Sequence, residues 1–254
     1  MTLIGSIRAE VIRQRHSRLS VVLIGFALGG VLIFLGYYSF VTYDPWSEVT
    51  VYLELVGGVI PLVVGLVCGF VAERELQAGG YAALLSLPSR RLALAGVMIQ
   101  MEMLYVLVAL VSVGPFALGM ALWGQNPLSM GLWLQVLLGL ILGGAALIPL
   151  TMVIALAWGR QFGILTGVLG SLLGYLLQTG LGDRIWWFLP PALPSHLSAG
   201  VPALADAGRL AQGAMDGYRT VQGLGWVMSI VLALLSWVLA MVWVAAFQPG
   251  RGRR

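Results

Sequence analysis

Residues 53–71 read LELVGGVIPLVVGLVCGFV, and Glu54 is the only charged side chain among them. A transmembrane helix needs about 20 mostly apolar residues to cross roughly 30 Å of hydrocarbon. Five more stretches of this kind lie at residues 19–41, 92–122, 132–158, 162–181 and 224–247. The strands of a transmembrane barrel need only about ten residues of alternating polarity, so these long apolar stretches do not fit a barrel. The sequence therefore predicts an all-α, polytopic membrane protein with six transmembrane helices in a single domain, residues 1–254.

The composition of the chain excludes several classes of protein. Apolar residues make up 59% of the 254 residues and charged residues 9%, whereas soluble domains average about 45–50% and 25%. All 14 basic residues are arginine, so the lysine of a Walker phosphate-binding loop is missing. Two distant histidines and a single cysteine cannot build a zinc cluster or a disulfide framework. We therefore expect no enzymatic activity, metal or cofactor in this chain.

The arginines also predict how the chain lies in the membrane, because cytoplasmic loops are enriched in basic residues. Placing both termini in the cytoplasm leaves only Arg184, Arg209 and Arg219 on the outer side. The sequence pI near 9.6 then reflects membrane orientation, not a nucleic-acid partner. We expect a multi-pass protein of the cell's inner or plasma membrane, in contact with its lipids.

Two segments outside the spans have an apolar period of their own. In residues 1–18, Ile4, Ile7, Val11 and Ile12 repeat at helical spacing among arginines. This pattern favours an elbow helix in the membrane plane. The alternative is an ordinary arginine-rich stretch that flanks the first span on its cytoplasmic side. Residues 182–222 contain the aromatic run Trp186-Trp187-Phe188, expected at the depth of an aromatic belt. We expect this outer segment to be re-entrant, with its prolines at residues 190–194 opposing helix and residues 201–218 forming one.

The cytoplasmic segment 72–91 reads AERELQAGGYAALLSLPSRR and is the most polar stretch between spans. Gly79-Gly80 interrupts it, and Pro88 ends a short apolar face. Such a face could insert into the groove of a partner, or the loop could simply cap its own helices. Glu73 and Glu75 could pair with a partner's arginines or with Arg90 and Arg91. The candidate coupling residues are Glu73, Glu75, Tyr81, Leu84, Leu85 and Leu87.

One carboxylate, Glu102, lies well inside a predicted span, with Gln100 nearby. An ionisable group in lipid is a functional candidate because burying its charge costs several kcal/mol. The stretch 92–122 is about 46 Å long as a helix, so Glu102 could instead lie near the headgroups in a structural role. Both readings remain open for this pair.

The predicted spans also contain glycines and prolines, which affect how helices pack and bend. Glycines at residues 139, 143 and 144, and at residues 167, 170 and 174, have spacings that allow helices to approach closely. Pro61 and Pro149 are expected to kink their helices. Ser171 has no histidine in any span to activate it, so it predicts no intramembrane protease.

In this order the segments resemble the ABC-2 type permeases, the membrane subunits of type V ABC transporters. Residues 73–91, ERELQAGGYAALLSLPSRR, look like their acidic, glycine-broken loop ending in LLS-x-P. The chain is most similar to the lantibiotic-immunity permeases. It departs from the pattern after Pro88, where Arg90-Arg91 stands in place of a lysine.

The resemblance implies a half-transporter that pairs with a second copy or a sister permease and with two separate ATPase subunits, which hold ATP and Mg. Residues 73–87 would contact the ATPase and transmit its conformational change. The first, second and fifth spans would line the transport pathway in the dimer. The implied cargo is an amphiphilic or antimicrobial peptide, although other hydrophobic compounds share this layout. The alternatives are an ATP-independent transporter or channel and a scaffold subunit that transports nothing.

Overall fold

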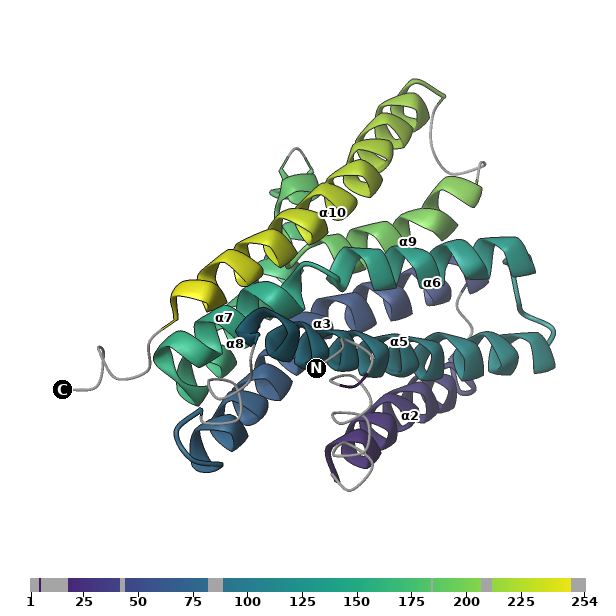
Figure 1. The fold of residues 1–254 in the computed structure, drawn as a ribbon. Coiled ribbons are helices and arrows are strands. Elements are labelled where there is room, and N and C mark those ends of the chain that lie inside the picture. Colours follow the sequence, from purple (N-terminus) through teal and green to yellow (C-terminus); the bar gives the residue numbers. More distant parts are fainter. Residues whose placement is uncertain are drawn as a thin grey trace.

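The computed structural model describes residue 5 and residues 18–41, 44–81, 89–183, 185–206 and 212–247. Within these residues all regular secondary structure is helical, which confirms the all-α prediction. The elements shown in Figure 1 are α2 (Arg18–Tyr38), α3 (Pro45–Gln77), α5 (Arg90–Leu122), α6 (Met130–Gly144), α7 (Leu147–Trp158), α8 (Arg160–Leu177), η1 (Trp186–Phe188), α9 (Leu193–Ala205) and α10 (Gln212–Ala246). The predicted elbow helix lies outside the described residues, apart from Gly5 and Arg18.

Six spans among the described residues are long and apolar enough to cross a membrane, as predicted: α2, α3, α5, the α6–α7 pair, α8 and α10. α3, α5 and α10 begin before the apolar stretches that predicted them, whereas α2 and α8 end before theirs do. α3 begins at Pro45, well before Leu53, because Asp44 caps it by accepting a hydrogen bond from the Ser47 N–H at 3.0 Å. Proline is also well tolerated in a first helical turn.

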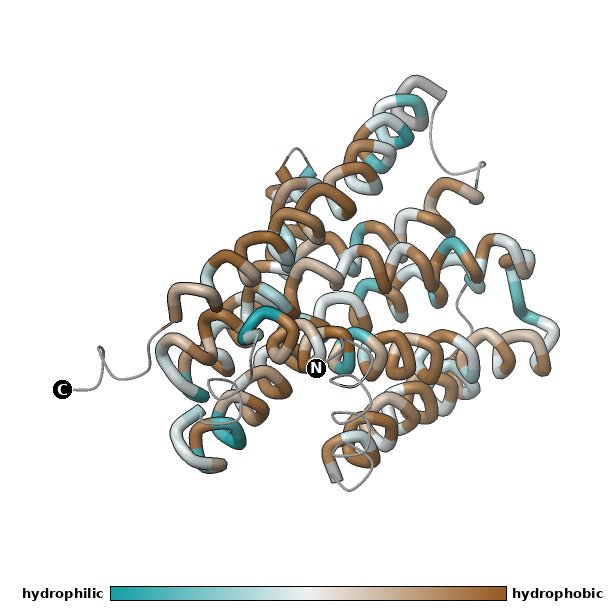
Figure 2. Tube along the Cα trace, in the orientation of Figure 1, coloured by the Kyte–Doolittle hydropathy of each residue, from teal (hydrophilic) through white to brown (hydrophobic). Residues whose placement is uncertain are grey.

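Hydrophobic side chains cover the outside of the bundle. Val21 and Ile33 on α2 are each 72% exposed, and Leu172 on α8 and Val242 on α10 are each 62% exposed. Figure 2 shows hydrophobic positions along the helices and hydrophilic ones mainly toward their ends. Exposed apolar surface on this scale needs lipid or another protein to cover it, so the chain is a multi-pass membrane protein.

Glycines bring α3 and α8 into close contact. A Cβ atom added to Gly65 would lie 2.5 Å from the Cα of Gly167, and one added to Gly167 would lie 2.7 Å from the carbonyl oxygen of Pro61. Pro61 has no N–H, and the neighbouring Leu62 N–H donates to Ser171 Oγ on α8 at 2.9 Å. α3 thus continues through its proline with α8 supplying a polar partner.

The α6–α9 contact uses glycine in the same way. A Cβ atom on Gly139 would lie 2.8 Å from the carbonyl oxygen of Leu197, and one on Gly143 would lie 2.7 Å from the backbone of Pro194. Together with the α3–α8 contact, this confirms that the predicted glycine positions permit close helix approach. α9 therefore lies along the same part of the bundle as α6.

The fourth span is broken, and the break replaces the kink expected at Pro149. α6 ends at Gly144 and α7 begins at Leu147, which places Pro149 in the first turn of α7. A proline clashes with the carbonyl four residues before it, here that of Ala145. The helix therefore stops ahead of the proline instead of bending at it.

The helix in the segment 182–222 begins earlier than expected. α9 starts at Leu193 and ends at Ala205, with Pro194 in its first turn. The proline therefore starts the helix, which its fixed φ favours, although the sequence suggested that it opposes helix. Residues 207–211 lie outside the described residues, and Gln212 already belongs to α10. The predicted helix over residues 201–218 is thus wrong.

Candidate functional site

The helices of the bundle begin and end at two opposite ends. The arginine-rich end is formed by the end of α3, the starts of α5 and α8, and the ends of α7 and α10. The opposite end is formed by the start of α3, the end of α8, α9 and the start of α10. Arg160 marks the arginine-rich end, where its guanidinium carbon lies 4.4 Å from the ring centroid of Phe70.

The predicted coupling segment starts in the last turns of α3. The Gln77 side-chain amide donates to Glu73 Oε1 at 2.8 Å in an exposed pair. Glu75 is only 4% exposed, and its Oε1 lies 3.8 Å from Nη2 of Arg74. Glu73 is therefore the acidic side chain that is accessible from outside, while Glu75 is held inside the chain.

A tight turn follows α3. Gly79, Gly80 and Tyr81 have φ values of 107°, 64° and 69°, which lie in the left-handed region. Glycine adopts this region freely, but a residue with a Cβ atom does so at a cost. The Gly80 N–H donates to the Leu76 carbonyl at 2.7 Å, and the Tyr81 N–H donates to the Glu75 carbonyl at 3.1 Å. The turn sends Tyr81 back toward the bundle.

Tyr81 is the centre of a group that we call the Tyr81 clasp, made of Tyr81, Arg90, Leu156 and Phe247. The Tyr81 side chain is 5% exposed, and its hydroxyl donates to the Leu156 carbonyl at 3.4 Å. Its ring meets that of Phe247 edge-on, with centroids 5.6 Å apart. Arg90 Nη1 donates to the Phe247 carbonyl at 2.9 Å. The clasp thereby joins the end of α3 to α5, α7 and α10.

The sequence predicted only part of this arrangement. It placed Tyr81 on an apolar face that could enter a partner's groove or cap the chain's own helices, and Tyr81 is buried in its own chain. Leu84, Leu85 and Leu87 lie outside the described residues, so their role stays a prediction. The sequence did not predict that Phe247 contacts Tyr81, because hydropathy identified Phe247 only as the last residue of a span. An aromatic residue at a span end close to arginines is the signal that could have identified it.

Glu102 lies about 18 Å along α5 from its start at Arg90, at 1.5 Å per residue. Its Oε1 atom is shielded from solvent and has no hydrogen-bond partner among the described residues. Cys68 and Tyr105 are close enough to interact electrostatically with it, and Gln100 is buried nearby on the same helix. The described part of the chain thus provides Glu102 with no counter-charge.

The segment 182–222 is attached to α8 and α10 around His196. The Trp186 ring stacks on the imidazole with centroids 4.6 Å apart, and His196 Nε2 donates to the Leu177 carbonyl at 3.0 Å. The Gln222 side chain of α10 donates to the His196 carbonyl at 3.0 Å. Burial lowers the pKa of His196, although the Leu177 bond and the charge of Asp183 oppose that shift.

This packing corrects one expectation. Trp186 is 3% exposed, so it is not part of an aromatic belt facing lipid. Phe188 is 42% exposed and is the residue of that run with a clearly exposed side chain. A 3₁₀ helix has three residues per turn, so Trp186 and Phe188, two positions apart, point to different sides.

Comparison with known families gives one match. The model of a family described as "ABC-2 family transporter protein" matches residues 6–176. This range covers two thirds of the chain, from before α2 to near the end of α8, and it includes the Tyr81 turn. A search of curated proteins found no match.

Proposed function

Since this chain belongs to the ABC-2 family of transporter proteins, and is therefore a membrane permease of an ABC transporter, we propose that it works as an exporter subunit driven by separate ATPase subunits. The chain has no lysine, so it lacks the residue with which a Walker loop reaches the nucleotide phosphates. ATP and Mg would bind the partner ATPase, and this chain would supply no catalytic chemistry.

The Tyr81 clasp is the observation that carries this proposal. A permease without its own ATPase must receive work through a contact surface, and that surface must be tied to the spans that move. Residues 73–81 are tied in this way, because Tyr81 contacts Leu156 on α7 and Phe247 at the end of α10. In this proposal, Glu73 contacts the ATPase, while Tyr81 and Glu75 hold the segment in place.

The proposed orientation puts the arginine-rich end in the cytoplasm, with both termini there. Arg74, Arg90, Arg91 and Arg160 gather at that end, which agrees with the enrichment of basic residues in cytoplasmic loops. The membrane is then the inner or plasma membrane of the cell. In this orientation α9, packed along α6 and α3, is a re-entrant helix that enters from the outer side.

The cargo and the assembly follow from the subfamily likeness. We propose an amphiphilic or antimicrobial peptide as the cargo, as in lantibiotic immunity, or another hydrophobic compound. A second copy or a sister permease would complete the pathway. α2 supports this part of the proposal, because half of its described residues are exposed and, among those described, only Ala27 and Val31 are buried.

The test measures how much ATPase co-purifies with the permease after the charge of Glu73 is reversed. We expect Glu73→Arg to reduce the amount of ATPase that co-purifies with the detergent-solubilised permease by at least severalfold. Asp216→Arg is the matched control, because it reverses an exposed carboxylate at the opposite end and should retain the ATPase. If the wild-type permease captures no ATPase from its native membrane, an ATP-independent transporter or scaffold replaces this proposal.

A further inference from the structure

A small polar cavity of about 60 Å³ lies at the opposite end of the bundle, between α3, the end of α8, α9 and α10. A single water needs only about 10–15 Å³ of such space, so the cavity has room for an ammonium-sized group with water beside it. The polar side chains that line it are Thr50, Glu54, Gln178, Ser195, His196 and Tyr218.

Most of the donor hydrogens of this lining are already engaged by backbone carbonyl groups. The bonds are Thr50 Oγ1 to Trp46 O (2.8 Å), Gln178 Nε2 to Glu54 O (3.0 Å), Ser195 Oγ to Ala192 O (3.0 Å) and His196 Nε2 to Leu177 O (3.0 Å). Within the part of the chain that the structure describes, the hydrogens that remain free are those of the Tyr218 hydroxyl and of one Gln178 N–H. The other free atoms are acceptors, namely the hydroxyl lone pairs, the amide oxygen and Nδ1 of the neutral imidazole. The cavity is therefore suited to a ligand that donates hydrogen bonds.

Glu54 gives this cavity its charge. It is the one formally charged side chain in the lining, and its carboxylate accepts no hydrogen bond from the described residues. Within those residues, no group of three His, Cys, Asp or Glu side chains could hold a metal ion. A half-buried carboxylate surrounded by neutral acceptors matches a cation that carries its own N–H donors.

We propose that this cavity binds a primary ammonium group through Glu54. The same chemistry is offered by the ethanolamine headgroup of a phospholipid and by a small free amine. This site lies away from the Tyr81 clasp, and the proposal does not depend on ATP-driven export.

The first test measures thermal unfolding of the purified protein in detergent with methylammonium chloride. Tetramethylammonium chloride at equal concentration is the ligand control, because it has the same charge and no N–H donor. We expect methylammonium alone to raise the unfolding temperature. Glu54→Gln should weaken its apparent affinity by roughly tenfold or more, the range expected for losing a charged hydrogen bond.

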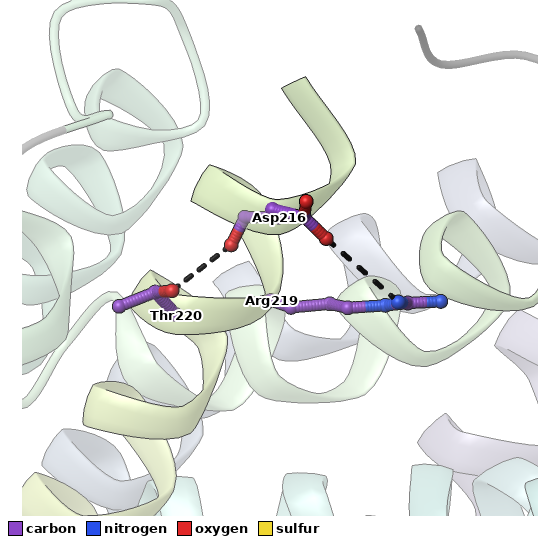
Figure 3. Close-up of polar contacts among 3 residues, drawn as sticks. All are labelled: Asp216, Arg219 and Thr220. Atoms are coloured by element: carbon purple, nitrogen blue, oxygen red, sulfur yellow. Dashed lines mark hydrogen bonds and ion pairs between the residues drawn. The ribbon is translucent and has the colours of Figure 1, made fainter. Parts of the chain in front are cut away.

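Asp216→Asn is the matched control variant. Asp216 is an exposed carboxylate near the start of α10 and pairs with Arg219 at 4.0 Å, while its carbonyl accepts from Thr220 (Figure 3). This variant should respond to methylammonium as the wild type does. If Glu54→Gln does not fold, Thr50→Val keeps the charge and removes one acceptor, and it should give a smaller but measurable loss of affinity.

A second experiment separates the two sources of the ammonium group. The protein is reconstituted in nanodiscs of phosphatidylethanolamine or phosphatidylcholine, whose headgroup has no N–H donor. Stabilisation by phosphatidylethanolamine, without a response to methylammonium, identifies the lipid as the source, and the reverse identifies a free amine. The proposal is overturned if neither ligand stabilises the wild type, if tetramethylammonium acts equally well, or if Glu54→Gln keeps the full response.

Discussion

At the scale of single residues, Tyr81 shows how a local cost is offset by tertiary contacts. A non-glycine residue in the left-handed region costs about 1–2 kcal/mol, and Tyr81 has a φ of 69°. Its buried ring and its bond to the Leu156 carbonyl offset this cost. The unfavourable backbone therefore marks a position where the side chain must point inward.

His196 provides a prediction about pH at the same scale. Burial lowers its pKa, so the unfolded chain takes up a proton at a higher pH than the folded chain. Stability due to this residue is complete above the unfolded value of about 6.5 and falls as the pH drops below it. We expect His196→Gln to lose less thermal stability than the wild type between pH 7.5 and pH 5.5.

The measurement is the unfolding temperature of both proteins in detergent at the two pH values. Only the difference between them reports on His196, because other groups titrate in both. Equal losses on acidification would show that His196 does not carry this dependence.

At the scale of elements, the helix pairs are held together where side chains are smallest. The α3–α8 and α6–α9 contacts both depend on glycine, with backbone atoms of one helix lying where a Cβ atom of the other would be. Packing of this kind is typical of membrane helices, for which burial from water is not the driving force. Such pairs should tolerate extra volume poorly.

Gly167→Ala tests this expectation. The added Cβ atom would lie 2.7 Å from the Pro61 carbonyl oxygen, so backbone must shift, and we expect a loss of about 1–3 kcal/mol. Gly114→Ala on α5 is the control, because a Cβ atom there has no atom within 4 Å. It should be neutral or stabilising by up to about 1 kcal/mol. Denaturant unfolding in mixed micelles measures both, and similar effects of the two substitutions would contradict the packing argument.

At the scale of the whole molecule, the clasp connects residues 73–81, the segment that we propose contacts the ATPase, to three spans. Arg90→Ala removes the donor to the Phe247 carbonyl and frees the end of α10, whereas the neighbouring Arg91 has an exposed side chain. We expect Arg90→Ala to reduce ATP-driven export at least severalfold while the ATPase still co-purifies. Arg91→Ala should export nearly as the wild type does.

Export is measured in cells or proteoliposomes, and co-purification is measured on the same preparations. Loss of ATPase binding in Arg90→Ala would mean that Arg90 belongs to the contact surface itself. Normal export by this variant would show that the clasp does not transmit movement.

The sequence predicted the six spans because each needs an uninterrupted apolar run, which residues 53–71 illustrate. It could not predict the place of Tyr81, because Leu156 and Phe247 are distant in sequence and only the packed bundle brings them together. It misjudged the start of α9, because Pro194 is compatible with a first turn as well as with a loop. Hydropathy reports how deep a segment lies and gives little information about which neighbour it meets.

The break between α6 and α7 has a mechanical consequence. Gly139 and Gly143 fix α6 to α9, while Leu156 fixes α7 to Tyr81. The residues between Gly144 and Leu147 therefore separate two helices that are anchored to different neighbours. In the proposed function, a force on residues 73–81 would therefore reach α7 through the Tyr81–Leu156 bond, while α6 is held by α9.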